Sequence, residues 1–210
     1  MALCSDLLAD LNDLINDATN AQIPEATKIR YLNHGIRAMY PKIYKTVRDT
    51  TVVLVADTYE YNIPSAVGSN TMGLRVEIET GVATGRYDAA ANYYVIPGLT
   101  DPILQLGGGA LPAPAGSRVR FTAAKQLTEF ATSSSSYDGP TGTEQLPVLY
   151  ALGMVASRTM DDRLDHRRYP TITGANGVTP TDLQNASTFW FSQFELLLDR
   201  RAMPLPTPWG

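Results

Sequence analysis

The residues that most often carry out chemistry in proteins are sparse in this sequence, and they do not form a catalytic pattern. Histidine occurs only as His34 and His166, and the position four residues after each holds no metal ligand, so the spacing predicts no zinc site. A catalytic histidine also needs a positioned partner, so we expect His34 to be packed or on the surface. His166 lies among charged residues and is expected to contact solvent. Cys4 is the only cysteine, which excludes a disulfide within the chain and a cysteine-rich metal site.

Three other motifs could suggest a phosphate-binding, nucleophilic or calcium-binding site, but each has a simpler structural interpretation. Gly107–Gly109 lacks the Gly-Lys-Ser/Thr ending of a phosphate-binding loop and predicts a turn. Ser133–Ser136 lacks the strand-to-helix setting of a nucleophilic serine and predicts a linker. Asp161, Asp162 and Asp165 miss the EF-hand spacing, and the arginines among them favour an ion-pair network. We therefore predict no catalytic, metal-binding or cofactor-binding residue, and no enzymatic activity.

Composition narrows the class of protein further. The chain has 210 residues, of which 44% are hydrophobic and 18% charged, so a sizeable core is expected rather than general disorder. The net charge of -4 argues against a protein that grips nucleic acid through its phosphates. The N-terminus lacks the pattern of a secretory signal, and no window approaches the ~20 apolar residues of a membrane span. We expect a protein made in a cytosol-like compartment without a membrane partner.

Two amphipathic helices are predicted at the N-terminal end. The first begins at Ser5, whose hydroxyl can accept a hydrogen bond from the first turn, and ends near Asn20. The second begins at Pro24, is basic along its length and is bent or divided at Pro41. Their apolar stripes are Leu7, Leu8, Leu11, Leu14 and Ile15 in the first helix, and Ile29, Leu32, Ile36, Met39 and Ile43 in the second.

The first helix also carries an acidic stripe, made of Asp6, Asp10, Asp13 and Asp17 at steps of four, three and four residues. One interpretation is an ordinary solvated face. The other is that the stripe faces a basic neighbour or lines a DNA passage, where repeated acidic faces would repel phosphate and let a duplex slide. The spacing alone leaves both open.

The period changes from helical to alternating near Thr50. Strands are predicted at 51–55, 59–63, 74–78, 92–96, 103–106 and 118–122, separated by turns rich in Gly, Pro and Asn. Short strands at close spacing favour antiparallel hairpins, hence a small sheet, sandwich or barrel.

Two more helices are predicted in the C-terminal third. Pro147 opens one, which ends at Tyr169-Pro170, and the last begins at Thr179 or Thr181. Phe189, Phe191, Leu196 and Leu198 make the apolar face of the last helix wider than one core contact needs. The segment after it contains Pro204, Pro206 and Pro208 and then Trp209, which predicts an extended arm suited to docking in a partner.

This order of elements predicts an α+β fold. We expect a helical bundle of about four helices, two N-terminal and two C-terminal, with an inserted antiparallel β-rich domain. The bundle comprises residues 1–49 and 143–203, and its first and last helices should pack together. The β-rich insertion comprises residues 50–131. A flexible Ser/Gly loop is expected at 132–142 and an extended Pro-rich C-terminal arm at 204–210.

In four stretches of its sequence, the chain resembles the head-to-tail adaptor (connector) proteins of tailed bacteriophages. The resemblance rests on Leu7–Asp13, on Arg30–Tyr40, on Asp57–Pro64 with Val119–Ala123, and on Leu146-Pro147 with the aromatic last helix. It implies a structural virion protein at the head–tail junction, synthesised in the bacterial host cytoplasm. It further implies a homo-oligomeric ring, commonly a dodecamer, that binds the portal protein, receives the next tail or stopper component, and surrounds dsDNA without binding it specifically.

The resemblance also assigns the docking role to particular residues. The portal-docking arm would comprise Arg200, Arg201, Pro204, Leu205, Pro206, Pro208 and Trp209. Two alternatives remain. A tail-completion or terminator subunit would share the ring but not the portal contact. A carbohydrate-binding or hydrolytic β module would use Tyr59, Tyr61, Tyr93 and Tyr94 to stack on sugars, with Glu77 and Glu79 as carboxylates.

Overall fold

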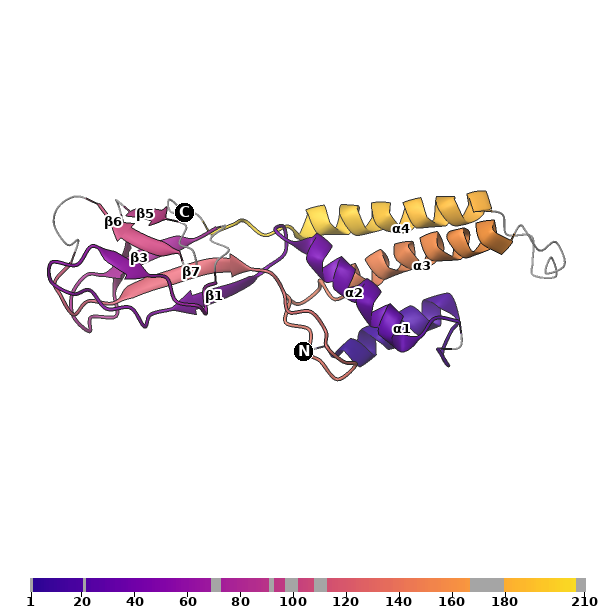
Figure 1. The fold of residues 1–210 in the computed structure, drawn as a ribbon, viewed down its shortest axis with the longest axis horizontal. Coiled ribbons are helices and arrows are strands. Elements are labelled where there is room, and N and C mark those ends of the chain that lie inside the picture. Colours follow the sequence, from indigo (N-terminus) through magenta and orange to yellow (C-terminus); the bar gives the residue numbers. More distant parts are fainter. Residues whose placement is uncertain are drawn as a thin grey trace. The chain divides into compact units, whose positions relative to one another are not determined.

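The chain folds into two compact units, shown in Figure 1. The computed structural model describes residues 2–20, 22–68, 73–90, 93–96, 102–107, 113–166 and 180–206. The helical unit comprises Met1–Tyr44 and Gln126–Met203, and the β unit comprises Lys45–Lys125 and Pro204–Gly210. The predicted α+β class, with two N-terminal and two C-terminal helices around a β region, is confirmed.

The helical unit is built around its third helix. Its elements are α1 (Cys4–Ile15), α2 (Glu25–Met39), α3 (Gln145–His166) and α4 (Pro180–Arg201). Helix α3 packs against each of the other three, and α3 and α4 lie side by side along their length (Figure 1). We expected the first and last helices to close the bundle, but α1 packs mainly against α3 and to a lesser extent against α2.

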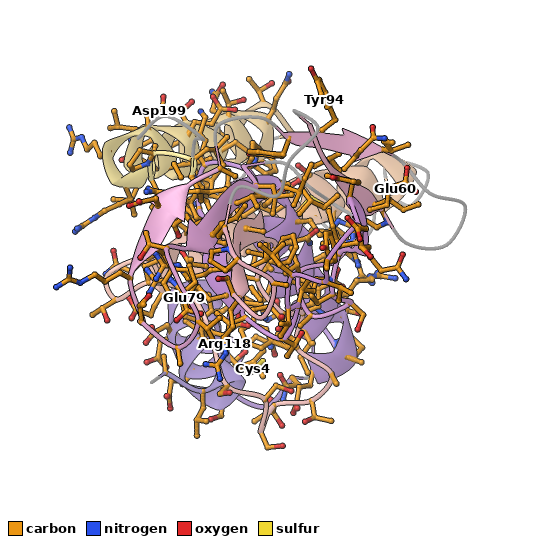
Figure 2. All side chains as sticks on the ribbon, turned by 90° about the vertical axis from the view of Figure 1, so that its left-hand side faces the viewer. Cys4, Glu60, Glu79, Tyr94, Arg118 and Asp199 are labelled. Carbon is orange, nitrogen blue, oxygen red and sulfur yellow. The ribbon has the colours of Figure 1, made fainter. Side chains whose placement is uncertain are left out.

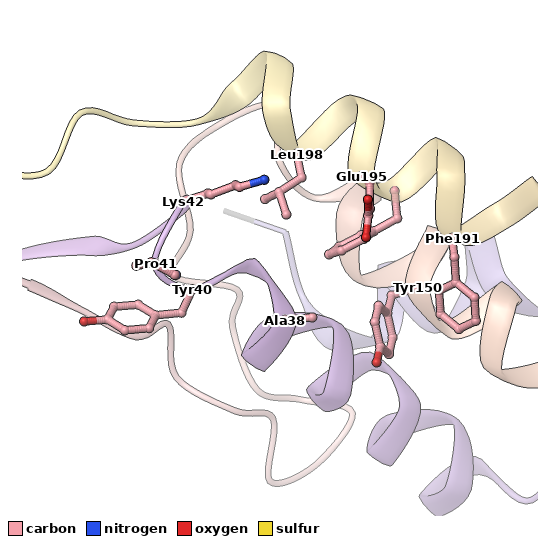
Figure 3. Close-up of a pocket in the computed structure, with 9 residues that line it drawn as sticks. Ala38, Tyr40, Pro41, Lys42, Tyr150, Phe191, Glu195 and Leu198 are labelled. Carbon is pink, nitrogen blue, oxygen red and sulfur yellow. The ribbon is translucent and has the colours of Figure 1, made fainter. Parts of the chain in front are cut away.

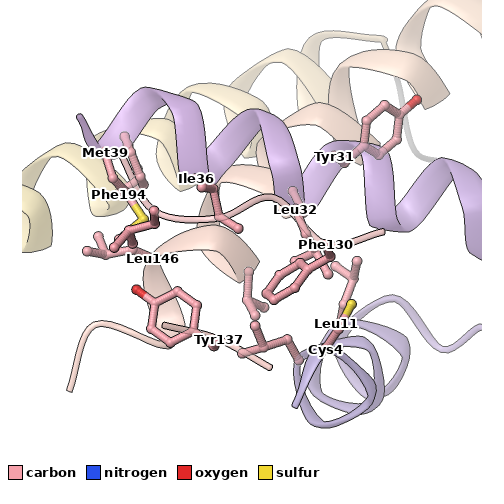
Figure 4. Close-up of a cluster of buried hydrophobic side chains, with 14 of the residues drawn as sticks. Cys4, Leu11, Tyr31, Leu32, Ile36, Met39, Phe130, Tyr137, Leu146 and Phe194 are labelled. Atoms are coloured by element: carbon pink, nitrogen blue, oxygen red, sulfur yellow. The ribbon is translucent and has the colours of Figure 1, made fainter. Parts of the chain in front are cut away.

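The core of this unit includes residues that we predicted to lie outside the bundle, in the insertion 50–131 and in the flexible loop 132–142. Leu11, Leu32, Ile36 and Leu146 are fully buried among helix residues, and Phe130 and Tyr137 enter the same cluster from the segment before α3 (Figure 4). The Tyr137 hydroxyl is 2.7 Å from the Thr143 hydroxyl, and burial raises the pKa of Tyr137 to about 12.

The serine run within that segment is anchored to the N-terminus. The N–H of Cys4 donates to the Ser135 carbonyl and the N–H of Ser5 to that of Ser133, both at 2.8 Å, while the N–H of Tyr137 donates to the Ala2 carbonyl at 2.9 Å. Residues 132–142 are therefore part of the helical unit and not a free linker. The Ser- and Gly-rich composition predicted flexibility. Composition could not show that the backbone of this segment bonds to residues at the N-terminus.

The β unit contains two antiparallel sheets that share one core. Its strands are β1 (Lys45–Asp49), β2 (Glu60–Asn62), β3 (Arg75–Glu79), β4 (Tyr87–Ala89), β5 (Tyr93–Ile96), β6 (Ile103–Leu106) and β7 (Val119–Lys125). The four-stranded sheet has the order β1-β7-β3-β4 and the three-stranded sheet the order β2-β6-β5. Val76, Phe121 and Ala123 from the first sheet and Tyr61 and Leu104 from the second are buried together.

The start of the β region was predicted wrongly. Residues 45–49, predicted as part of the second helix, form strand β1, because α2 ends at Met39, two residues before Pro41. The proline removes an N–H and disfavours helix in the residue before it. Within the predicted strand 51–55 the structure shows only an isolated bridge between Val53 and Arg118. Strand β4 was not predicted, since it is a three-residue edge strand in a polar segment.

Candidate interaction surfaces

The acidic stripe of α1 is shorter than its spacing predicts. Asp6, Asp10 and Asp13 are exposed on the helix, and the Asp6 carboxylate accepts a hydrogen bond from the Leu3 N–H at 2.8 Å. Asp17 does not belong to the stripe, because α1 ends at Ile15 and Asn16 turns the chain with φ 53. The exposed acidic face of α1 therefore consists of three aspartates.

Asp17 instead forms a buried ion pair at the corner between α1 and α2. Its Oδ2 lies 2.9 Å from Lys28 Nζ, and both side chains are almost completely buried. Lys28 also donates to the Asn12 side chain, the Asn20 side chain and the Asp17 carbonyl. The hydrogen bond from Lys28, with backbone N–H groups of Ile23 and Gln22, lowers the pKa of Asp17 to about 2 despite its burial. This lysine holds the connecting loop in place.

The Asn33-His34-Gly35 stretch, part of the resemblance, has a packing role. The Asn33 amide donates to the Phe130 carbonyl at 2.9 Å, and the Phe130 N–H donates to Asn33 Oδ1 at 2.8 Å. A Cβ at Gly35 would lie 2.9 Å from Pro147 Cα, so a side chain there would meet the backbone of α3. The motif thus fixes α2 against both the 126–144 segment and α3. Sequence spacing could not show this, since both partners lie far along the chain.

The first part of the predicted docking arm is held by the chain itself. The Met203 N–H donates to the Lys42 carbonyl at 2.8 Å. Beyond it, Leu205 and Pro206 are half-buried, and a Cβ at Gly73 would lie 3.1 Å from Pro206 Cδ and 3.3 Å from Leu205 Cδ2. Gly73 also has a φ of +63, which favours glycine.

Pro204 is exposed, and the remaining arm residues fall into two groups. Arg200 and Arg201 are exposed at the C-terminal end of α4, where positive charge complements the helix dipole. Pro208 and Trp209 lie outside the described residues. The prediction that they dock is therefore left to experiment.

Helix α4 carries apolar side chains that its own unit does not cover. Phe194 and Leu198 are buried, whereas Phe189 is 53% exposed and Leu196 is 46% exposed. Phe189 and Leu196 are two helical turns apart and so lie on one side of the helix. The wide apolar face expected from the sequence therefore divides into a packed side and an exposed side.

A pocket of about 450 Å³ lies in the helical unit between the end of α2 and α4 (Figure 3). It is lined by Ala38, Tyr40, Pro41, Lys42, Tyr150, Phe191, Phe194, Glu195 and Leu198. Lys42 donates to Asp199 on α4, so its ammonium is already engaged. The lining combines apolar side chains with Lys42 and Glu195. The hydrogen bond to Asp199, with the charges of Asp199 and Glu195, raises the pKa of Lys42, so this lysine is held as a cation and is not a general base.

The tyrosines proposed to bind sugars do not form a common platform. The Tyr61 ring is buried, and its hydroxyl donates to the Thr58 carbonyl at 2.8 Å. Tyr93 is half-buried, with its hydroxyl 3.3 Å from the Leu74 carbonyl. Tyr94 follows Tyr93 on the same strand and therefore points to the opposite face. This arrangement gives no support to a carbohydrate-binding module.

The two carboxylates of that alternative are also engaged. Glu77 receives hydrogen bonds and charge stabilisation from Arg120, with further stabilisation from Arg75 and Arg48, and its pKa is lowered. Glu79 is 1% exposed and accepts from the Gly85 and Arg118 N–H groups, which lowers its pKa as well. Neither has the raised pKa that a general acid in glycoside hydrolysis requires.

Several predicted groups cannot be placed. Gly108, Gly109, the side chains of Asp161, Asp162, Asp165 and His166, and residues 167–179 lie outside what the structure describes. Within the described part of the chain, no group of three His, Cys, Asp or Glu residues is arranged to hold a metal ion. Nor does that part contain a helix long and apolar enough to span a membrane.

Comparison with known proteins gives one extended match. A family model described as SU10 adaptor protein matches residues 3–202. The chain is also similar to a chain in the solved structure "Neck of empty GTA particle computed with C6 symmetry", with 18% identity, coverage of 90% of this chain and 92% of that chain, and a TM-score of 0.32. For "Virion of native gene transfer agent (GTA) particle" the identity is 16%, with the same coverage and TM-score. No curated protein matches the sequence.

Proposed function

Because the chain belongs to the SU10 adaptor protein family, we propose that it is the head-to-tail adaptor of a virion and forms a ring between the portal and the tail. The observation that carries this proposal is the family match over residues 3–202, which covers most of both units and ends before the C-terminal arm. The ring surrounds the DNA passage, uses no cofactor and catalyses no reaction. We propose a dodecamer, located at the head–tail junction after synthesis in the bacterial host cytoplasm.

The exposed side of α4 supports a role in assembly. Large apolar side chains that remain exposed together on one helix side are typical of surfaces that another protein covers. Phe189 and Leu196 meet this description. We propose that neighbouring subunits or the portal cover them.

The acidic face of α1 fits a position beside the DNA passage. Asp6, Asp10 and Asp13 are exposed. An acidic lining repels phosphate and would let the duplex pass without specific binding. Asp17 has no part in this role, because it is buried with Lys28.

The C-terminal arm is proposed as the contact with the portal. Arg200, Arg201, Pro204, Leu205 and Pro206 lead to Pro208 and Trp209, and proline-rich segments lose little entropy on docking. Since Leu205 and Pro206 already contact the β unit at Gly73, we place the docking group in residues 207–210.

The test is portal association with and without that group. Deleting residues 207–210 keeps the contacts of Leu205 and Pro206 and should abolish co-purification with the portal, while self-association of the purified chain in native mass spectrometry persists. Unchanged portal binding would exclude the arm as the docking group. Self-association without any portal binding by the full chain would instead favour a tail-completion or terminator ring.

A further inference from the structure

The four-stranded sheet presents a basic outer face. Its inner side chains, such as Val76 and Phe121, are buried in the core, so the alternate residues point away from it. Arg48 on β1 and Arg75 on β3 are both paired with Thr122 on β7, which places them in one row across three strands. In the next row Arg120 is paired with Glu77. We call Arg48, Arg75, Glu77, Tyr87 and Arg120 the arginine face.

The arginine face is organised by a single carboxylate. Glu77 Oε1 lies 3.1 Å from Arg75 Nη2, and Oε2 lies 2.6 Å from Arg120 Nε. Arg120 also lies over the Tyr87 ring, 4.2 Å from its centroid. Glu79 lies on the same side of β3, but it is 1% exposed and accepts hydrogen bonds from the Gly85 and Arg118 N–H groups. The three guanidinium groups therefore exceed the two buried carboxylates and leave this face positively charged. Arg48 is the exposed member of the three, since Arg75 and Arg120 are partly buried.

The opposite side of the β unit has a different character. On the three-stranded sheet, Glu60 and Tyr94 are both paired with Gln105, and Asn62 and Ile96 are both paired with Ile103. These six residues form what we call the tyrosine face. Tyr94 is 67% exposed and Ile96 is 39% exposed, and Figure 2 shows Tyr94 pointing away from the ribbon. Exposed Glu60 adds negative charge to this face.

The two faces match in chemistry and in spacing. Arg48 and Arg75 are separated by two strand spacings, or ~9.6 Å, and so are Glu60 and Tyr94. A guanidinium pairs with a carboxylate and stacks on an aromatic ring. Tyrosine and arginine are also the residue types enriched in protein interfaces.

We propose that, in the ring, the arginine face of one copy docks on the tyrosine face of the next copy, with Arg48 against Glu60 and Arg75 over the Tyr94 ring. This inference rests on the proposed function, since it requires a ring. A contact between two different faces of one subunit repeats from copy to copy, and it closes when the rotation between copies divides a full turn.

Cross-linking of mixed single-cysteine variants tests the contact. The background is silent, because Cys4 is fully buried and burial raises its pKa to about 11. Arg48→Cys and Glu60→Cys chains, mixed and treated with a short bis-maleimide, should give a cross-linked dimer that neither variant gives alone. The matched control is exposed Arg86→Cys mixed with Glu60→Cys, which should give none.

Each outcome has a separate meaning. Self-association with no dimer between Arg48→Cys and Glu60→Cys chains would overturn this inference and leave the ring intact. Absence of self-association by the unmodified chain, alone and with the portal, would contradict the proposed function and this inference with it.

Charge reversal gives an independent test. Arg48→Glu and Glu60→Arg should each weaken self-association about tenfold, because each places like charges together, and the double variant should recover most of the loss. Arg86→Glu makes the same change in charge at an exposed residue beside β4, at the opposite edge of the sheet from Arg48, and should have a much smaller effect. If the loss of self-association in the double variant equalled the sum of the losses in the two single variants, the pairing of Arg48 with Glu60 would be overturned.

Discussion

Replacing Asn33 with alanine should destabilise the helical unit by about 3 kcal/mol. The Asn33 side chain makes two buried hydrogen bonds to Phe130, at 2.8 and 2.9 Å, and satisfies both the N–H and the carbonyl of that residue. Its removal leaves a buried donor and a buried acceptor without a partner, each at a cost of about 1–3 kcal/mol. Alanine returns at most about 0.7 kcal/mol through its higher helix propensity.

The assay is urea unfolding followed by far-UV circular dichroism, which reports mainly on the helices. Asn185→Ala is the matched control, because Asn185 is exposed on α4 and the same substitution there should raise stability by at most about 0.7 kcal/mol through helix propensity. A change for Asn33→Ala that is no more destabilising than that of the control would refute the role given to this side chain.

Three further predictions concern the helical unit. Gly35→Ala should destabilise it by about 1 kcal/mol in the same assay, because the clash with Pro147 outweighs the gain in helix propensity; a stabilised variant would contradict the close approach. Because the folded-state pKa of Asp17 is lowered from 3.8 to about 2, its stabilising contribution is complete above pH 3.8 and is lost as the pH falls towards 2. The stability difference between wild type and Asp17→Asn should therefore shrink over that range, and a constant difference would exclude the ion pair with Lys28 as its cause. Native Cys4 should resist a maleimide at neutral pH and react after denaturation; rapid labelling of the folded chain would show that the thiol is not buried.

The strands that could be predicted from sequence are those with clear alternation and turn residues at both ends. The predicted strands at 59–63, 74–78, 92–96, 103–106 and 118–122 correspond to β2, β3, β5, β6 and β7. Strand β1 was missed because its residues, Lys45–Asp49, are as compatible with a basic helix as with a strand. The proline at 41 was the available signal. The prediction that it bends or divides the helix is replaced by a helix that ends at Met39, just before it.

Which residues belong to each candidate surface depends on tertiary contacts, and the spacing of residues in the sequence does not show these contacts. Asp17 has the right interval for the acidic stripe, but the left-handed Asn16 ends the helix before it and Lys28 takes its carboxylate. Composition predicted an extended arm, yet Leu205 and Pro206 pack beside Gly73, more than a hundred residues earlier in the sequence. The exposed face with Phe189 and Leu196 was partly foreseen, because the apolar residues of the last helix exceed what one core contact needs.

The central claim is that copies of this chain form a ring that joins the portal to the tail. Electron microscopy of the purified chain assembled with its portal protein tests this most directly. The account predicts an annular assembly, coaxial with the portal, whose central channel is wide enough for a DNA duplex. Single copies scattered on the portal, or an assembly without a central channel, would contradict it.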